Sequence, residues 1–231
     1  MARAPAEPGR DCPRCPRLVA FRELWRTREP TWYNAPVGSF GPRKARLAIV
    51  GLAPGLRGAN RTGRPFTGDF AGDLLYQTLI SAGFAKGVYD RRVDDGLVLV
   101  DCAIVNAVRC VPPQNKPTPQ EIATCRRYLT TALGALTNLK AIVALGRIAH
   151  ESALRAMAVR LAAFPFAHGA IHRLPNGLAL FDSYHCSRYN TNTGVLTAAM
   201  FAEVFSAARR HIGKPPAGRG RPGVALADRR V

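Results

Sequence analysis

Acidic residues are scarce in this 231-residue chain: 15 Asp and Glu stand against 33 Lys and Arg, for a formal net charge of +18 at pH 7. Long apolar runs are also missing, because no window approaches the roughly 20 apolar residues of a transmembrane helix. No apolar segment precedes Cys12, so the N-terminus shows no signal-peptide pattern. We therefore expect a cytoplasmic protein with no membrane segment.

The basic excess favours a polyanionic partner such as nucleic acid. A generally basic proteome or a basic tail would be a less specific explanation, and residues 213–231 do hold part of the excess. Most of the basic residues lie between positions 12 and 212. Residues 1–11 and 213–231 lack apolar periodicity, so we expect two disordered ends around one domain over residues 12–212.

Between these ends, short apolar runs alternate with helical patterns. The capping box Thr118-Pro119-Gln120-Glu121 starts one of the helices. This alternation predicts an α/β fold in which helices cover both faces of a parallel sheet. The expected strands are 47–51, 96–108, 139–145 and 178–183, and the expected helices are 69–82, 119–133, 148–161 and 195–212.

Four of the six cysteines have a spacing suited to a metal centre. Cys12 and Cys15 form a C-x2-C pair, Cys110 follows a predicted strand, and Cys125 lies in the next predicted helix. Disulfides are uncommon in the cytoplasm, whereas four thiolates can hold zinc or an iron–sulfur cluster. The spacing alone does not separate these two, and unrelated structural cysteines are a third explanation. Cys102 is expected in the core.

Two segments rich in glycine and asparagine each follow a predicted strand and precede a helix. The first runs from GLAPG at 51–55 to FTGD at 66–69, and the second from SYHCS at 183–187 to NTNTG at 190–194. Loops at the carboxyl ends of strands carry the ligand sites of open α/β sheets, so we expect both segments at one site. Together they resemble the active-site motifs of the uracil-DNA glycosylase superfamily, most closely its family 5 enzymes. The resemblance covers about residues 12–212 and implies a three-layer α/β/α sandwich around a mainly parallel four-stranded sheet.

Excision of a base requires a flipped nucleotide, a stabilised leaving anion and a positioned water. The resemblance implies that His185 donates a hydrogen bond to the carbonyl oxygen of the base; alone, it would be an ordinary loop histidine. Ala53 cannot hold water through its side chain. Asp69 is the candidate for this task, although it also fits a helix N-cap. Asn115 matches a further functional asparagine of family 5, or else is a turn residue.

The base pocket has its own candidates. Asn106 interrupts an apolar strand and therefore needs a hydrogen-bond partner. Family 4 has an asparagine here that reads the uracil edge, and an amide offers the matching donor and acceptor. Phe66 is placed to stack on the base or to pack in the core, and Gly55 implies a permissive pocket because stricter enzymes carry a bulky aromatic there. The motifs also assign Gly51, Ala53, Ser187 and Asn190 to substrate binding.

Family 4 and family 5 enzymes hold a [4Fe–4S] cluster, and the resemblance maps its ligands to Cys12, Cys15, Cys110 and Cys125. The predicted function is a monomeric, monofunctional DNA repair glycosylase. It would hydrolyse the N-glycosidic bond of uracil, and of hypoxanthine or other deaminated bases, in DNA and leave an abasic site. One alternative is a strictly uracil-specific, family 4-like glycosylase. Another is a non-catalytic iron–sulfur protein that binds DNA or senses redox state.

Overall fold

The computed structural model describes residues 7–213, so the predictions for residues 1–6 and 214–231 lie outside the described residues. Residues 7–11 belong to the described part and contact the domain. Glu7 forms an ion pair with Arg109 at 3.1 Å, and Asp11 forms one with Arg26 at 2.7 Å. The composition of this segment did not predict these contacts.

A five-stranded sheet, in the order β4-β1-β5-β7-β6, forms the centre of the molecule. Four neighbouring strands run parallel, and β6 pairs antiparallel with β7 at one edge. The expected sheet of four strands is therefore corrected to five. The added strand escaped prediction because it is three residues long and has a single apolar side chain. The strands are β1 (Leu47–Gly51), β4 (Cys102–Asn106), β5 (Ala141–Leu145), β6 (Ile171–Arg173) and β7 (Ala179–Ser183).

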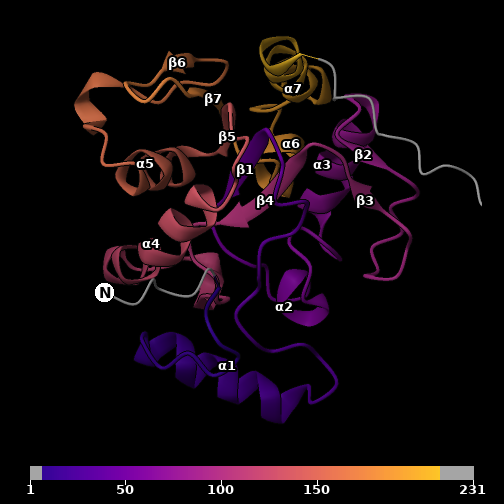
Figure 1. Cartoon of the computed structure of the whole chain (residues 1–231). Coiled ribbons are helices and arrows are strands. Elements are labelled where there is room, and N and C mark those ends of the chain that lie inside the picture. Colours follow the sequence, from indigo (N-terminus) through magenta and orange to yellow (C-terminus); the bar gives the residue numbers. More distant parts are fainter. Residues whose placement is uncertain (1–6, 214–231) are drawn as a thin grey trace, which may run out of the picture.

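Helices cover both faces of this sheet (Figure 1). Alternate residues of each strand point to opposite faces, and in β1 Ile49 packs toward one set of helices while Val50 packs toward the other. Helices α3 (Phe70–Ser81) and α7 (Ala198–Ile212) cover the first face, and α4 (Pro119–Gly134) and α5 (Arg147–Ala156) cover the second. The α/β alternation read from the sequence is confirmed.

The predicted strand over residues 96–108 is two strands in the structure. Strand β3 (Val98–Leu99) pairs with β2 (Ala85–Lys86) in a small antiparallel sheet, and the chain then enters β4. Between them, Asp101 adopts a positive φ of 60° and its carboxylate binds Arg46 at 2.6 Å. This tertiary ion pair explains a break that the apolar pattern did not show.

The remaining elements are short apart from the N-terminal helix α1 (Pro16–Arg28), which follows the C-x2-C pair. Helix α2 (Ala59–Thr62) lies in the first motif and α6 (Arg188–Asn192) in the second, and the 3-10 turns are η1 (Pro113–Asn115) and η2 (Leu161–Ala163). Within residues 7–213, no helix combines the length and apolarity needed to cross a bilayer.

Candidate active site

Both sequence motifs open onto one cavity of about 410 Å³ at the carboxyl ends of β1 and β7. The two segments are far apart in the chain, and the parallel sheet brings them together because neighbouring strands end at the same edge. Seven of the predicted site residues line this cavity: Ala53, Gly55, Phe66, Asp69, Asn115, His185 and Ser187. Leu52, Phe70, Ala71 and Arg188 complete the lining.

His185 leaves the end of β7 and is fixed by the short helix that follows. The side-chain amide of Asn190 donates to the carbonyl oxygen of His185 at 2.8 Å, and the Ser187 hydroxyl caps α6 by accepting the Asn190 N–H. Burial lowers the pKa of His185 to about 4. The imidazole is therefore neutral at pH 7 and can still donate one N–H to a group in the cavity.

Phe66 forms one wall of the cavity and stands beside the histidine. Its ring lies 6.1 Å from the His185 ring, centroid to centroid, at an interplanar angle of 30°. A Cβ on Gly51 would lie 2.8 Å from the Phe66 ring and would collide with Oδ1 of Asn106. Only glycine at position 51 therefore allows the ring and the amide to approach the end of β1.

Asn106 ends β4 directly opposite Gly51, and its Oδ1 lies close to the Phe66 ring at the end of β1. The residue is 2% exposed, and its Oδ1 has no hydrogen-bond partner among the described residues. Leaving a buried acceptor unpaired costs about 1–3 kcal/mol, so such an atom calls for an explanation. Gly51, Asn106 and Asn190 are not themselves part of the cavity lining.

Asp69 serves as a helix cap and as a cavity wall at once. Its Oδ1 accepts the Gly72 N–H at 3.2 Å at the start of α3, while a Cβ on Gly55 would lie 2.7 Å from Oδ2. Burial raises the pKa of Asp69 above its usual range. The two readings of this residue from the sequence are thus compatible.

Asn115 also lines the cavity, at the end of η1. It has a positive φ of 57° and follows Gln114, whose φ is 56°. Asparagine tolerates this left-handed region better than most residues. The turn geometry and the exposed amide at the cavity therefore coexist, as they do for Asp69.

The four predicted ligand cysteines come together in a second place, between α1, α4 and the segment after β4. Cys12, Cys15, Cys110 and Cys125 line one small cavity and pack in one apolar cluster, whereas Cys102 and Cys186 lie in the main core. The Arg109 backbone N–H donates to the Cys125 sulfur at 3.3 Å. Burial raises the pKa of the Cys110 thiol to about 12 and that of Cys125 to about 11, so free thiols would stay protonated.

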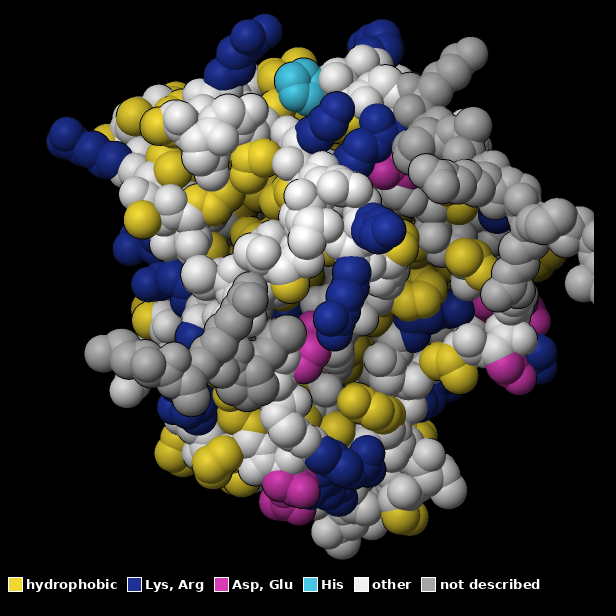
Figure 2. Space-filling view, in the orientation of Figure 1, with side chains coloured by type: hydrophobic (Ala, Val, Ile, Leu, Met, Phe, Trp, Pro, Cys, Tyr) yellow, Lys and Arg dark blue, Asp and Glu magenta, His cyan; other side chains and the backbone are white. Residues whose placement is uncertain are grey.

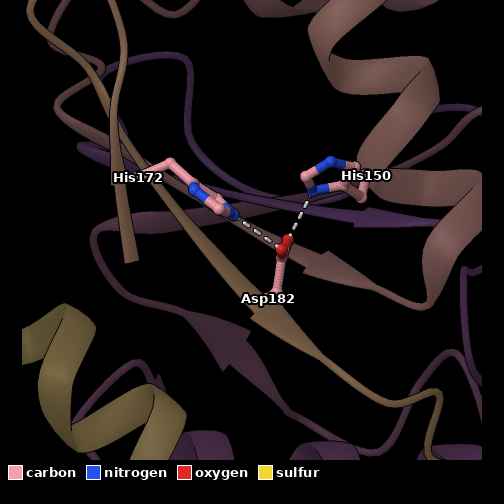
Figure 3. Close-up of side chains that lie close together, drawn as sticks. All are labelled: His150, His172 and Asp182. Carbon is pink, nitrogen blue, oxygen red and sulfur yellow. Dashed lines mark hydrogen bonds and ion pairs between the residues drawn. The ribbon is translucent and has the colours of Figure 1, made fainter. Parts of the chain in front are cut away.

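A cluster of ionisable side chains that the sequence did not single out lies outside both cavities (Figure 3). The two imidazoles take different oxygens of one buried carboxylate: His150 Nδ1 lies 2.7 Å from Asp182 Oδ1, and His172 Nε2 lies 3.0 Å from Oδ2. The other ring nitrogen of His150 lies 2.9 Å from the carbonyl oxygen of Phe164. This hydrogen-bond network joins α5, β6 and β7. An aspartate inside the apolar run 178–183 was the available signal.

Comparison with known proteins places this geometry in a family. The chain matches the Uracil DNA glycosylase superfamily over residues 38–209. A type-5 uracil-DNA glycosylase from Thermus thermophilus is 49% identical over 208 residues, which are 87% of this chain and 94% of that protein. Another from Pyrobaculum aerophilum is 38% identical over 207 residues, 88% and 90% of the two chains. A type-4 uracil-DNA glycosylase from Archaeoglobus fulgidus is 37% identical over 116 residues, 50% of each.

The type-5 relatives match 87–88% of the chain, while the type-4 relative matches half of it. The two motifs that suggested the resemblance meet at one cavity. The chain belongs to the uracil-DNA glycosylase superfamily, in its type-5 branch.

Proposed function

We propose that this chain is a monofunctional DNA repair glycosylase that hydrolyses the N-glycosidic bond of uracil in DNA and leaves an abasic site. The observation that carries the proposal is the meeting of the two motifs at one cavity of about 410 Å³. A base reaches such a cavity only after rotation out of the duplex. Figure 2 shows Lys and Arg side chains spread over one face of the molecule, which suits a DNA partner.

Recognition of the flipped base falls to Phe66 and Asn106. The Phe66 ring offers a flat apolar face on which a base stacks. The Asn106 amide presents an acceptor and a donor, which match N3–H and O4 of uracil, and its Oδ1 lacks a partner within the described residues. Uracil binding would remove the cost of that unpaired oxygen.

In the chemical step, water attacks C1′ of the sugar as the bond from C1′ to the base breaks, and the electron pair leaves with the base. His185 donates its N–H to the carbonyl oxygen on which negative charge develops. A neutral imidazole suits this role because its proton is present before, during and after the step. Asp69 holds the water and accepts its proton, a role that the Ala53 methyl cannot fill.

The open position at Gly55 supports a wider substrate range that includes hypoxanthine. Gly55 lines the cavity without a side chain, which leaves room for a purine. Glycine is also favoured there because a Cβ would lie 2.7 Å from Oδ2 of Asp69. Duplex oligonucleotides with one uracil or one hypoxanthine, treated with the protein and then with alkali, test both parts. Cleavage at both bases is expected. Cleavage at uracil alone would support the strictly uracil-specific alternative, and no cleavage at either would support a non-catalytic DNA-binding protein.

We further propose that Cys12, Cys15, Cys110 and Cys125 hold a [4Fe–4S] cluster. The four side chains line one small cavity between α1, α4 and the segment after β4. Four thiolates can hold a tetrahedral zinc or an iron–sulfur cluster, and the resemblance to family 5 enzymes favours the cluster. When bound, the cluster would crosslink the N-terminal segment to the connection between β4 and α4.

Iron analysis of the purified protein tests this assignment. About four irons per chain and a yellow-brown colour are expected. Cys110→Ser should lose iron and lower the unfolding temperature, because metal-binding energy is also folding energy. Cys102→Ala is the matched control, since this buried cysteine lies outside the set and its loss should leave the iron content unchanged. Stoichiometric zinc without iron would contradict the proposal.

A further inference from the structure

The loop that joins β2 to β3, residues 87–97, packs against the segment that carries Phe66 and Asp69. The Tyr89 hydroxyl donates to the carbonyl oxygen of Phe66 at 3.1 Å and accepts the Gly68 N–H at 3.3 Å. One side chain from outside both motifs thus holds the backbone on either side of Thr67.

A buried ion pair anchors this loop. Arg64 donates to both oxygens of Asp95, at 2.9 and 2.6 Å, and the two side chains are 6% and 0% exposed. The guanidinium Nε–H donates to the Thr67 hydroxyl at 2.7 Å. Asp95 also accepts the backbone N–H groups of Asp90 and Leu97, so the pair fixes the shape of the loop as well as its attachment.

Phe66 needs such external support because its backbone is strained. Its φ of 53° lies in the left-handed region, which an aromatic residue seldom adopts. Conformations of this kind persist only when the surrounding structure imposes them, at a cost of about 1–3 kcal/mol. The carbonyl that Tyr89 holds is the one that belongs to this strained residue, and the ring of the same residue forms the cavity wall.

The Tyr89 ring is itself held by a contact with a second aromatic ring, that of Tyr76. It lies 4.5 Å from the Tyr76 ring, centroid to centroid, and the Tyr76 hydroxyl donates to the carbonyl oxygen of Pro65 at 2.5 Å. Tyr76 is fully buried in α3. The contacts form a chain from the core through Tyr89 to the backbone of Phe66.

We infer that Tyr89 is a positioning residue for base excision, whose hydroxyl holds Phe66 in the left-handed conformation that places its ring against the flipped base. This inference rests on the proposed function of the cavity. It assigns a role in the reaction to a loop that neither motif contains.

The test removes only the hydroxyl. Tyr89→Phe should lower single-turnover excision of uracil at saturating enzyme by roughly ten- to a hundred-fold, the range that a misplacement of about 1 Å produces. Affinity for DNA with an abasic site should stay within about two-fold, because phosphate contacts dominate it. Tyr33→Phe is the matched control: its hydroxyl donates to a backbone carbonyl, that of Pro36, away from the cavity lining, and its loss should leave the rate unchanged.

Two further readouts separate positioning from general stability. Tyr89→Phe should slow a Phe66→Ala variant no further, because the effect passes through that ring; additive losses would overturn the inference. In the free protein, amide exchange at Gly68 should be faster in Tyr89→Phe than in the wild type. The inference would also be overturned if Tyr89→Phe showed the same amide exchange rate at Gly68 as the wild type, or the same excision rate. If the wild-type protein excised no base, that result would count against the proposed function. The comparison of amide exchange at Gly68 between Tyr89→Phe and the wild type would still test whether Tyr89 holds this segment.

Discussion

The methyl group of Ala53 lines the cavity and cannot hold a water molecule, so the remaining groups of the cavity must divide the work. His185 and Asp69 both line it, one as a neutral donor and the other as a buried carboxylate. Asn106 does not line the cavity, and its buried Oδ1 has no hydrogen-bond partner among the described residues. Substitutions at these three residues should therefore fail in different ways.

His185→Ala should reduce single-turnover excision of every base by about 10²–10³, the usual cost of losing one preorganised donor to developing negative charge. Asn106→Ala should act mainly on uracil, by removing contacts to its edge, and should spare hypoxanthine. Asp69→Asn should slow excision by a factor that depends on the base, because purines and pyrimidines place the water differently. Near-wild-type rates for His185→Ala, with total loss for Asn106→Ala, would reverse these roles.

The histidine also makes stability depend on pH. Its pKa falls from an ordinary 6.5 to about 4 on folding. Between these values the unfolded chain binds more protons than the folded one, so this contribution to stability is present above pH 6.5 and is lost as the pH falls toward 4. Its size is no more than about 2 kcal/mol between pH 7 and 5. Urea unfolding at both pH values should show that the free energy of unfolding falls less from pH 7 to pH 5 for His185→Gln than for the wild type. An equal fall in the two proteins would contradict this contribution of His185.

Sequence reasoning at this scale worked where a residue broke a pattern. Asn106 interrupts an apolar strand, which indicated a buried amide in need of a hydrogen-bond partner. Asp69 precedes a helical pattern, which indicated a helix N-cap. Tyr89 and Asp95 interrupt no apolar or helical pattern, because they lie in a polar loop of ordinary composition. Their contacts with Phe66 and Arg64 arise only from the tertiary fold.

At the scale of elements, the apolar runs predicted the parallel strands but not their partners. Strand β6 pairs with β7 through three residues with little apolar character. The break before β4 depends on Arg46, which is distant in sequence from Asp101. Segment 188–192, within the second motif, forms the short helix α6, capped by the Ser187 hydroxyl. Local periodicity carries no information about such contacts.

The His150–Asp182–His172 network makes a prediction at this scale, because it holds α5 and β6 against β7. Asp182→Asn keeps one acceptor oxygen, replaces the other by an NH2 group and removes the charge, so both histidines lose an ionised acceptor at a buried position. We expect a loss of about 1–3 kcal/mol in the free energy of unfolding, measured by urea denaturation.

Asp94→Asn serves as the control for this change, since its side chain is 73% exposed and its loss should shift stability by no more than about 0.5 kcal/mol. If Asp182→Asn unfolded at the same urea concentration as the wild type, the network would contribute nothing to holding these elements together.

At the scale of the whole molecule, charge should govern the encounter with DNA. A net charge of +18 implies binding through phosphates, with release of counterions. The dissociation constant for undamaged duplex DNA, measured by fluorescence anisotropy, should therefore rise steeply between low and moderate salt. Arg188→Ala, at the rim of the cavity, should reduce the slope of log K against log salt by no more than about one. Affinity that does not change with salt would exclude a phosphate-dominated interface.

Ala53 contacts two sites at once. Its methyl group lines the base cavity and also packs against the apolar cluster around which the four predicted ligand cysteines gather. A substitution at this position would therefore act in two places. A polar or larger side chain would change the space open to a base and would also change the packing beside the cysteines, so the two sites are mechanically coupled through one methyl group.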